Sequence, residues 1–159
     1  MRVINKHKRI INQPKRRVSE LLETLSTKDD KIWPNNNWPA IRFKNGLKVG
    51  SIGGHGPIRY KITNYKIGEN IYFEFIKPSS FKGFHYFEIK ENETNKTEVI
   101  HIINMRVIGL SMFYWLFVIR WLHDALIENA LDNIENEFST KKKTTNWNIW
   151  VKFLRQVLN

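Results

Sequence analysis

The spacing of hydrophobic and polar residues changes its period along the first forty positions. Residues 1–11 mix β-branched and basic side chains and are typical of an edge strand. Pro14 then opens a predicted helix, because proline is tolerated in a first turn and the apolar positions that follow have helical spacing: Val18, Leu21, Leu22 and Leu25. Residues 26–39 contain Trp33-Pro34 and Trp38-Pro39, and a residue before proline avoids the α conformation. We therefore expect a loop or a short second helix there.

From residue 40 onward the period becomes two, which predicts strands. Asn45-Gly46 is the strongest short hairpin signal in the chain, and it predicts a hairpin between residues 41–44 and 47–49. Short polar turns separate the remaining predicted strands, which cover residues 57–65, 71–76, 83–90 and 97–107. Connections this short imply antiparallel pairing.

Residues 111–138 are then predicted to form one long helix, with Ser111 as its N-cap. Its first part is almost wholly apolar, but the run over residues 110–122 is too short for a membrane span of about 20 residues, and Arg120 interrupts it. A helix that is apolar all round is buried on more than one side. The order of elements predicts an α+β fold in which this helix covers the apolar face of a curved antiparallel sheet.

Length, charge and composition narrow the functional classes. A chain of 159 residues suits one domain, and the absence of cysteine excludes disulfides, thiolate metal sites and cysteine nucleophiles. The formal charge of +11 favours acidic partners, but the basic residues are scattered and match no recognition motif, so we do not expect nucleic-acid binding. Residues 1–14 lack the apolar run of a signal peptide, and we expect a cytoplasmic location.

Four segments resemble a bacterial branch of the SRPBCC (START-like, polyketide cyclase/dehydrase-like) superfamily. They are Trp38-Pro39, GSIGGHGPIRY at 50–60, GFHYFE at 83–88 and RWLHDALIE at 120–128 with Leu131-Asp132 after it. The resemblance covers about residues 1–138 and implies a helix-grip fold, a curved sheet wrapped around a long C-terminal helix. It also implies a hydrophobic cavity in which members bind lipids, polyketides, hormones or other apolar molecules. It implies no single reaction and brings no catalytic set.

Side-chain periodicity brings three histidines toward the interior. Strand alternation places His85 and His101 on the core faces of neighbouring strands. On the long helix, at about 100° per residue, His123 falls within the apolar stripe, whereas Asp124 and Glu128 are predicted to point away. Three interpretations of these histidines stay open. Each histidine is hydrogen-bonded in the core, each is a polar contact in an apolar pocket, or the three bind zinc without a recognised motif spacing.

The glycine-rich segment 50–56 precedes a strand rather than a helix, so it is not a phosphate cradle, and we predict a flexible loop at the cavity mouth. Arg59 faces outward in a regular strand, but a bulge would turn it inward, where it could clamp a carboxylate. The predicted ligand-binding residues combine these positions with the inward apolar ones: His55, Arg59, Tyr60, Phe73, Phe75, His85, Phe87, His101, Ile103, Met105, Ile119, Leu122, His123 and Leu126. We predict no cofactor and no metal.

The chain ends in a predicted basic linker and amphipathic helix over residues 139–159, after a domain over residues 1–138. Its apolar positions have helical spacing: Trp147, Trp150, Val151, Leu154 and Val157. This helix either docks on the domain or contacts a membrane surface or a protein partner. Our leading hypothesis is a non-catalytic carrier or sensor of a hydrophobic small molecule or lipid. The alternatives are a small cyclase, dehydratase or hydrolase that uses His85, His101 and His123, and a partner- or membrane-binding protein without a pocket.

Overall fold

The computed structural model describes residues 1–158; of the predicted tail segment 139–159, only residue 159 lies outside the described residues. The strands are β1 (Arg2–Ile11), β2 (Arg42–Phe43), β3 (Ile52–His55), β4 (Ile58–Lys66), β5 (Asn70–Lys77), β6 (Phe81–Glu93) and β7 (Lys96–Val107). The helices are α1 (Lys15–Thr24), α2 (Ser111–Tyr114), a π-helical turn η1 (Trp115–Ile119), α3 (Arg120–Asn136) and α4 (Ile149–Val157).

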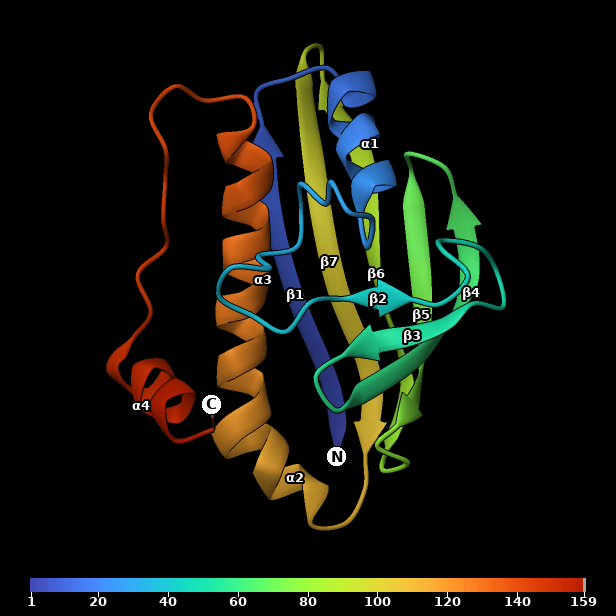
Figure 1. Cartoon of the computed structure of the whole chain (residues 1–159), viewed down its shortest axis with the longest axis vertical. Helices are drawn as coiled ribbons and strands as arrows, with labels where there is room; N and C mark the ends of the chain where they lie inside the picture. The colour runs from blue at the N-terminus through green and yellow to red at the C-terminus, as the bar shows by residue number, and fades with distance from the viewer. Residues whose placement is uncertain (159) are drawn as a thin grey trace.

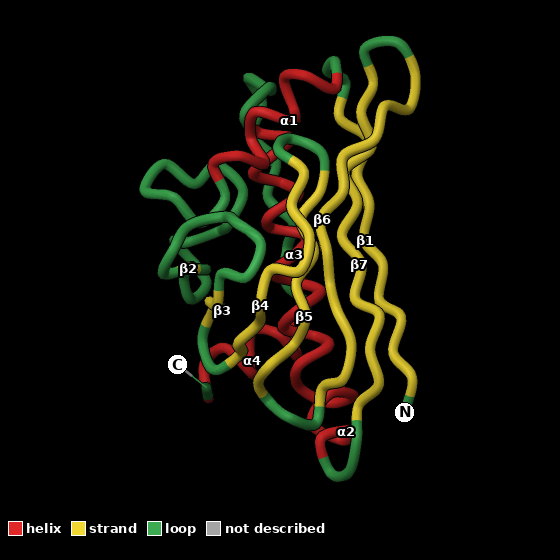
Figure 2. The backbone as a smooth tube through the Cα atoms, turned by 90° about the vertical axis from the view of Figure 1, so that its right-hand side faces the viewer, coloured by secondary structure: helices red, strands yellow, loops and turns green. Residues whose placement is uncertain are grey.

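All strands join one antiparallel sheet in the order β1-β7-β6-β5-β4-β3-β2. The sheet curves around α3 (Figure 1), and α1, α3 and α4 lie on one side of its long strands (Figure 2). The predicted α+β fold, with an antiparallel sheet covered by a C-terminal helix, is therefore confirmed. β1 is an edge strand that pairs with β7, so that His7 lies opposite His101.

Strand alternation builds the core between the sheet and α3. The main apolar cluster takes its sheet side chains from every second position, including Tyr60 and Ile62 of β4, Ile71 and Phe73 of β5, and Phe87 of β6. Leu126, Ala130 and Ile134 of α3 pack against them. Burying apolar surface is worth roughly 25 cal/mol per Å², so this cluster holds the helix in the concave face of the sheet.

The prediction of a tight hairpin at Asn45-Gly46 is wrong. Gly46 does turn the chain with a φ of 68°, but residues 47–49 form no strand, and β2 pairs instead with β3. The prediction of a flexible loop at 50–56 is wrong for residues 52–55, which form β3. Glycine is needed in that strand, since a Cβ at Gly53 would lie 2.2 Å from the carbonyl oxygen of Arg42. The glycines thus permit close strand pairing.

The long helix starts where predicted but is not regular. Its α conformation is interrupted by η1, and the side chain of Ser111 makes no capping hydrogen bond, so the N-cap prediction is wrong. A π turn inserts one residue into the helical register and rotates the faces on its two sides relative to each other. Within η1, Trp115 is buried, at 3% exposure, while Phe117, two residues later, is 59% exposed.

The C-terminal helix docks on the domain. The Asn148 side chain caps α4 by accepting a hydrogen bond from the Val151 amide, and Val151 and Leu154 are buried. The buried Asn129 of α3 accepts hydrogen bonds from the indole nitrogens of Trp38 and Trp147, at 3.1 and 2.9 Å. One amide oxygen thus anchors both the 33–39 loop and the tail. Within residues 1–158, no helix is both long enough and apolar enough to span a membrane.

Candidate ligand-binding cavity

A cavity of about 330 Å³ lies between the sheet, α3 and α4. Its sheet wall is formed by Tyr60, Phe75, Phe81, His85, His101 and Ile103. Its helix wall is formed by Trp115, Ile119, Leu122, His123, Leu126 and Ile127. The remaining lining residues come from loops, from the facing ends of β3 and β4, from α2, and from α4 and the residue after it: Trp33, Trp38, Pro39, His55, Gly56, Pro57, Ile58, Tyr114, Leu154, Arg155 and Leu158.

The three predicted histidines do come together on this cavity. His85 and His101 project from adjacent strands, with His85 Nδ1 and His101 Nε2 3.3 Å apart, and both are buried. The His123 ring lies 5.1 Å from that of His101, centroid to centroid. Alternation with a period of two on β6 and β7, and the α-helical stripe on α3, together account for this convergence.

Several buried polar atoms of the cavity wall have no hydrogen-bond partner among the described residues. They are the Tyr60 hydroxyl, His85 Nε2 and His101 Nδ1, whereas the unpaired His123 Nδ1 lies 3.7 Å from Asp124 Oδ1. An unpaired buried polar group costs about 1–3 kcal/mol. Each of these atoms exposes less than 1 Å², so hydrogen-bonding capacity that the described residues do not use lies just beneath the surface of an otherwise apolar wall.

Burial keeps these groups neutral. It lowers the pKa of His85 and His101 well below the ordinary value, and the nearby His123 adds to the effect. Burial also lowers the pKa of His55 to about 3 and raises that of Tyr60 well above its ordinary value. At neutral pH each imidazole is thus uncharged and offers one donor and one acceptor nitrogen.

The cavity lining also includes aromatic and cationic side chains that sequence reasoning missed, Trp33, Trp38 and Arg155, next to the predicted His55. The His55 ring packs 4.9 Å from that of Trp33. The Arg155 guanidinium lies 4.7 Å from the ring centroid of Trp38, and its Nη2 donates to the carbonyl of Asn37. The amphipathic pattern of α4 was visible in the sequence, but nothing in that pattern indicates which surface it covers.

Four predicted ligand-binding residues do not line the cavity. The Arg59 side chain is exposed, and its Nη1 donates to the carbonyls of Gly56 and Ile58, so it clamps no ligand. Phe73, Phe87 and Met105 are core residues outside the cavity lining. Phe73 stacks on His85, and Phe87 packs on His101, so they support the wall from behind.

The acidic residues of α3 do not point away from the sheet, contrary to the sequence prediction. Asn5, His7 and Arg9 alternate along the inward face of β1 and oppose the carboxylates of α3. His7 Nδ1 lies 2.7 Å from Glu128 and His7 Nε2 lies 3.1 Å from Asp124, while Arg9 bonds Glu128 and Asp132 at 2.8 and 3.1 Å. Because the sheet curves, its edge strand reaches the flank of α3 and covers a face that an isolated helix exposes.

These contacts change the ionisation of the seam between β1 and α3. Burial lowers the pKa of His7, but the hydrogen bonds to Asp124 and Glu128 outweigh it, so the pKa is raised overall. Burial also disfavours a charged Asp124, yet its contacts with His123, His7 and Asn5 hold the pKa of Asp124 well below its ordinary value. The seam is therefore an ionised network beside a neutral cavity.

Solved structures with the same arrangement of elements identify the fold. Norcoclaurine synthase from Thalictrum flavum, solved with a transition-state analogue, superposes with a TM-score of 0.65 over 87% of this chain and 96% of that one, at 9% identity. The chain has a helix-grip fold. A Thermobifida fusca protein solved by NMR matches at a TM-score of 0.66, 10% identity, and 91% and 99% coverage of the two chains. CalU16 from Micromonospora echinospora matches at 0.55, 11% identity and 87% of both chains.

Sequence comparison adds no family to this result. No protein-family model matches the chain, and no curated protein matches it. At identities of 9–11% the structural likeness supports the shared fold, and function has to be argued from the cavity.

Proposed function

We propose that the protein is an SRPBCC-type carrier or sensor that holds one neutral, compact, mainly apolar molecule in the cavity. The observation that supports this most directly is that three residues of an otherwise apolar cavity lining carry buried polar atoms without a partner, the Tyr60 hydroxyl, His85 Nε2 and His101 Nδ1. At about 330 Å³ the cavity is at the lower end of the roughly 300–1,000 Å³ of small-molecule sites. The preferred ligand carries a hydroxyl or carbonyl at one end, and no net charge.

A matched pair of probes tests this chemistry. We expect 1-naphthol to bind more tightly than naphthalene by about tenfold, the equivalent of one net hydrogen bond of about 1.4 kcal/mol. In Tyr60→Phe or His85→Leu the difference should shrink, because the hydroxyl loses its partner. Tyr72→Phe is the control, since Tyr72 lies between the inward positions Ile71 and Phe73 and does not line the cavity.

Native mass spectrometry of the purified protein should also show a co-purifying small molecule. Absence of any bound molecule, together with no measurable binding of either naphthalene probe, would overturn the proposal. Chemical conversion of a co-purified molecule that stops in His85→Gln and His101→Gln would instead favour the enzyme hypothesis. Under the carrier hypothesis those variants change affinity and produce no product.

We further propose that this carrier exchanges its ligand at an anionic lipid surface. Large apolar side chains remain exposed along residues 110–121 and along α4 and the residue after it, and two of them, Tyr114 and Leu158, also line the cavity: Leu110, Phe113, Tyr114, Phe117, Trp121, Ile149, Trp150, Phe153 and Leu158. The Trp150 indole donates to the carbonyl of Phe117, which joins the two elements into one surface. Arg120 and Lys152 are exposed beside it, and the chain carries a charge of +11. Apolar and aromatic side chains with basic neighbours suit an anionic interface.

Vesicle co-sedimentation tests this surface. We expect binding to vesicles of phosphatidylcholine with phosphatidylserine, weaker binding to phosphatidylcholine alone, and a decrease with salt. The double variant Phe117→Ser, Phe153→Ser should lose binding. Ile67→Ser is the matched control, because Ile67 is 67% exposed but lies in the turn between β4 and β5. Equal loss in the control, or no vesicle binding by the wild type, would reject this surface.

A further inference from the structure

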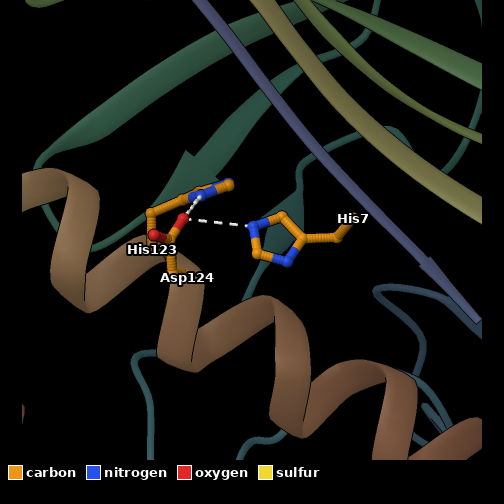
Figure 3. A group of neighbouring side chains, drawn as sticks. All are labelled: His7, His123 and Asp124. Atoms are coloured by element: carbon orange, nitrogen blue, oxygen red, sulfur yellow. Dashed lines mark hydrogen bonds and ion pairs between the residues drawn. The ribbon is translucent and has the colours of Figure 1, made fainter. Parts of the chain in front are cut away.

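A second group of potential ligand atoms lies behind the cavity wall, between β1 and α3. One ligand atom each from His7, His123 and Asp124 lie within 4.8 Å of one another. Figure 3 shows both imidazoles next to the same oxygen of the Asp124 carboxylate. Asp124 Oδ1 is 3.1 Å from His7 Nε2 and 3.7 Å from His123 Nδ1. The first contact is a hydrogen bond, and the second is too long for one.

The two separations from Asp124 are close to those in a zinc coordination shell, and the third, between His7 and His123, is within 4.8 Å. Zinc binds histidine nitrogen and carboxylate oxygen at about 2.0–2.2 Å in tetrahedral geometry, which places neighbouring ligand atoms roughly 3.3–3.5 Å apart. The two separations from Asp124 lie on either side of that range. Two histidines and one carboxylate are also the ligand types that zinc prefers, and three protein ligands leave a fourth position open.

The surroundings of His7 support the same assignment. A metal-binding histidine usually donates its other ring N–H to a carboxylate, which fixes the tautomer and the ring orientation. His7 Nδ1 lies 2.7 Å from Glu128 Oε1, and Arg9 holds the other oxygen of Glu128 at 2.8 Å. Without metal, His7 Nε2–H donates to Asp124 Oδ1; a bound cation would displace that proton, and the Nδ1–H that donates to Glu128 would leave the Nε2 lone pair directed at the cation.

Two polar atoms beside Asp124 are buried without a partner among the described residues. They are His123 Nδ1 and Asn5 Oδ1. Asn5 Nδ2 donates to Asp124 Oδ1 at 2.8 Å and so orients the carboxylate. Hydrogen bonding within the seam leaves the nitrogen of His123 unused, whereas a cation next to Asp124 would use it.

We propose that His7 Nε2, Asp124 Oδ1 and His123 Nδ1 bind one Zn²⁺ ion, with Glu128 and Asn5 as positioning residues. This site goes beyond the ligand-carrier function and differs from the set His85, His101 and His123 considered from the sequence. It shares only His123 with the cavity. Metal on Nδ1 would leave the His123 proton on Nε2 and would fix the ring that forms part of the helix wall.

Metal titration of the 159-residue chain tests the site, with Zn²⁺ in calorimetry and Co²⁺ in absorption spectroscopy. We expect one Zn²⁺ per chain and a Co²⁺ spectrum of low-coordinate nitrogen and oxygen ligation. His7→Gln and Asp124→Asn should abolish both signals. Glu128→Gln should weaken Zn²⁺ binding by about 10–100-fold without abolishing it. His85→Gln is the matched control and should bind Zn²⁺ like the wild type.

Thermal unfolding followed by circular dichroism shows whether each variant is folded, and the change in Tm on adding Zn²⁺ is compared within the same variant. Saturating Zn²⁺ should raise the Tm of the wild type and of His85→Gln, but not that of Asp124→Asn. The proposal is overturned if wild-type protein binds no stoichiometric Zn²⁺, or if binding persists in both His7→Gln and Asp124→Asn. Loss of binding in His85→Gln but not in His7→Gln would overturn it in favour of a cavity metal site. The naphthalene probes report separately on the carrier proposal.

Discussion

Tyr60 illustrates a conflict between stability and binding at a single residue. Its side chain is fully buried, yet its hydroxyl has no hydrogen-bond partner among residues 1–158. We expect Tyr60→Phe to raise the free energy of unfolding of the ligand-free protein by about 1 kcal/mol, because the substitution removes an unpaired buried polar group. Chemical denaturation checks this, with Tyr72→Phe as control. A destabilisation of similar size would mean that the hydroxyl has a partner, such as a bound water.

His55 gives the stability a defined dependence on pH. Burial, aided by the charges of His123 and Arg59, lowers the pKa of folded His55 to about 3 from an ordinary value of 6.5. The unfolded chain therefore takes up this proton first on acidification. The contribution of His55 to stability is complete above about pH 6.5 and is lost as the pH falls toward 3. At pH 5 the loss is about 2 kcal/mol.

The variant His55→Gln isolates that contribution. Between pH 7 and pH 5, the wild type should lose about 2 kcal/mol more of its free energy of unfolding than His55→Gln does. The ionised seam is the same in both proteins and cancels in the comparison. Urea denaturation at the two pH values provides the measurement, and equal losses in the two proteins would show that His55 titrates normally in the folded state.

Individual inward-facing residues could be predicted from periodicity, but cavity-lining residues could not be separated from core residues. His85 and His101 follow from alternation along two strands, since the period of two fixes which face each side chain joins. Phe73 obeys the same rule but lies behind the wall, where it stacks on His85. Depth within a face depends on sheet curvature, which the sequence pattern does not encode.

At the scale of elements, the seam between β1 and α3 is the main feature that the sequence did not predict. Its pairs join residues more than a hundred positions apart: Asn5 with Asp124, and Arg9 with Asp132. Alternating polar residues on an edge strand and carboxylates four residues apart on a helix both resemble solvent-exposed faces. Only the complementary spacing of Asn5, His7 and Arg9 against Asp124, Glu128 and Asp132 could have indicated that the two faces meet.

Arg9 and its neighbour Lys8 lie on opposite faces of β1, so substitutions at the two positions compare the effect of an inward and an outward basic side chain. The Arg9 side chain is 14% exposed and contacts Glu128, Asp132 and Glu135, whereas Lys8 is 62% exposed and pairs with Glu98. We expect Arg9→Ala to lower the free energy of unfolding by about 3 kcal/mol, because it leaves the 4%-exposed Asp132 without its cation. Lys8→Ala should cost less than about 1 kcal/mol. Denaturation curves at low and high salt measure both values, and equal small effects would contradict a structural role for the seam.

At the scale of the whole molecule, the C-terminal helix completes the cavity instead of forming a separate appendage. Leu154, Arg155 and Leu158 line the cavity together with residues of the sheet and α3. The helix-grip order of elements could be predicted from periodicity and from the resemblance. The docking of α4 could not, because its amphipathic pattern serves a domain surface, a partner or a membrane equally well.

Asn129 links the 33–39 loop to the C-terminal segment, and both segments contribute residues to the cavity lining, so its removal should affect both. It is 7% exposed, and its Oδ1 accepts the indole protons of Trp38 and Trp147. Asn129→Ala leaves both indoles unpaired and should lower the free energy of unfolding by about 2–3 kcal/mol. It should also speed tryptic cleavage at Lys141, Lys142 and Lys143 and the release of bound 1-naphthol. Asn133→Ala, which removes one bond to Ile32, is the control. Unchanged cleavage and release in Asn129→Ala would show that α4 is held independently of this anchor.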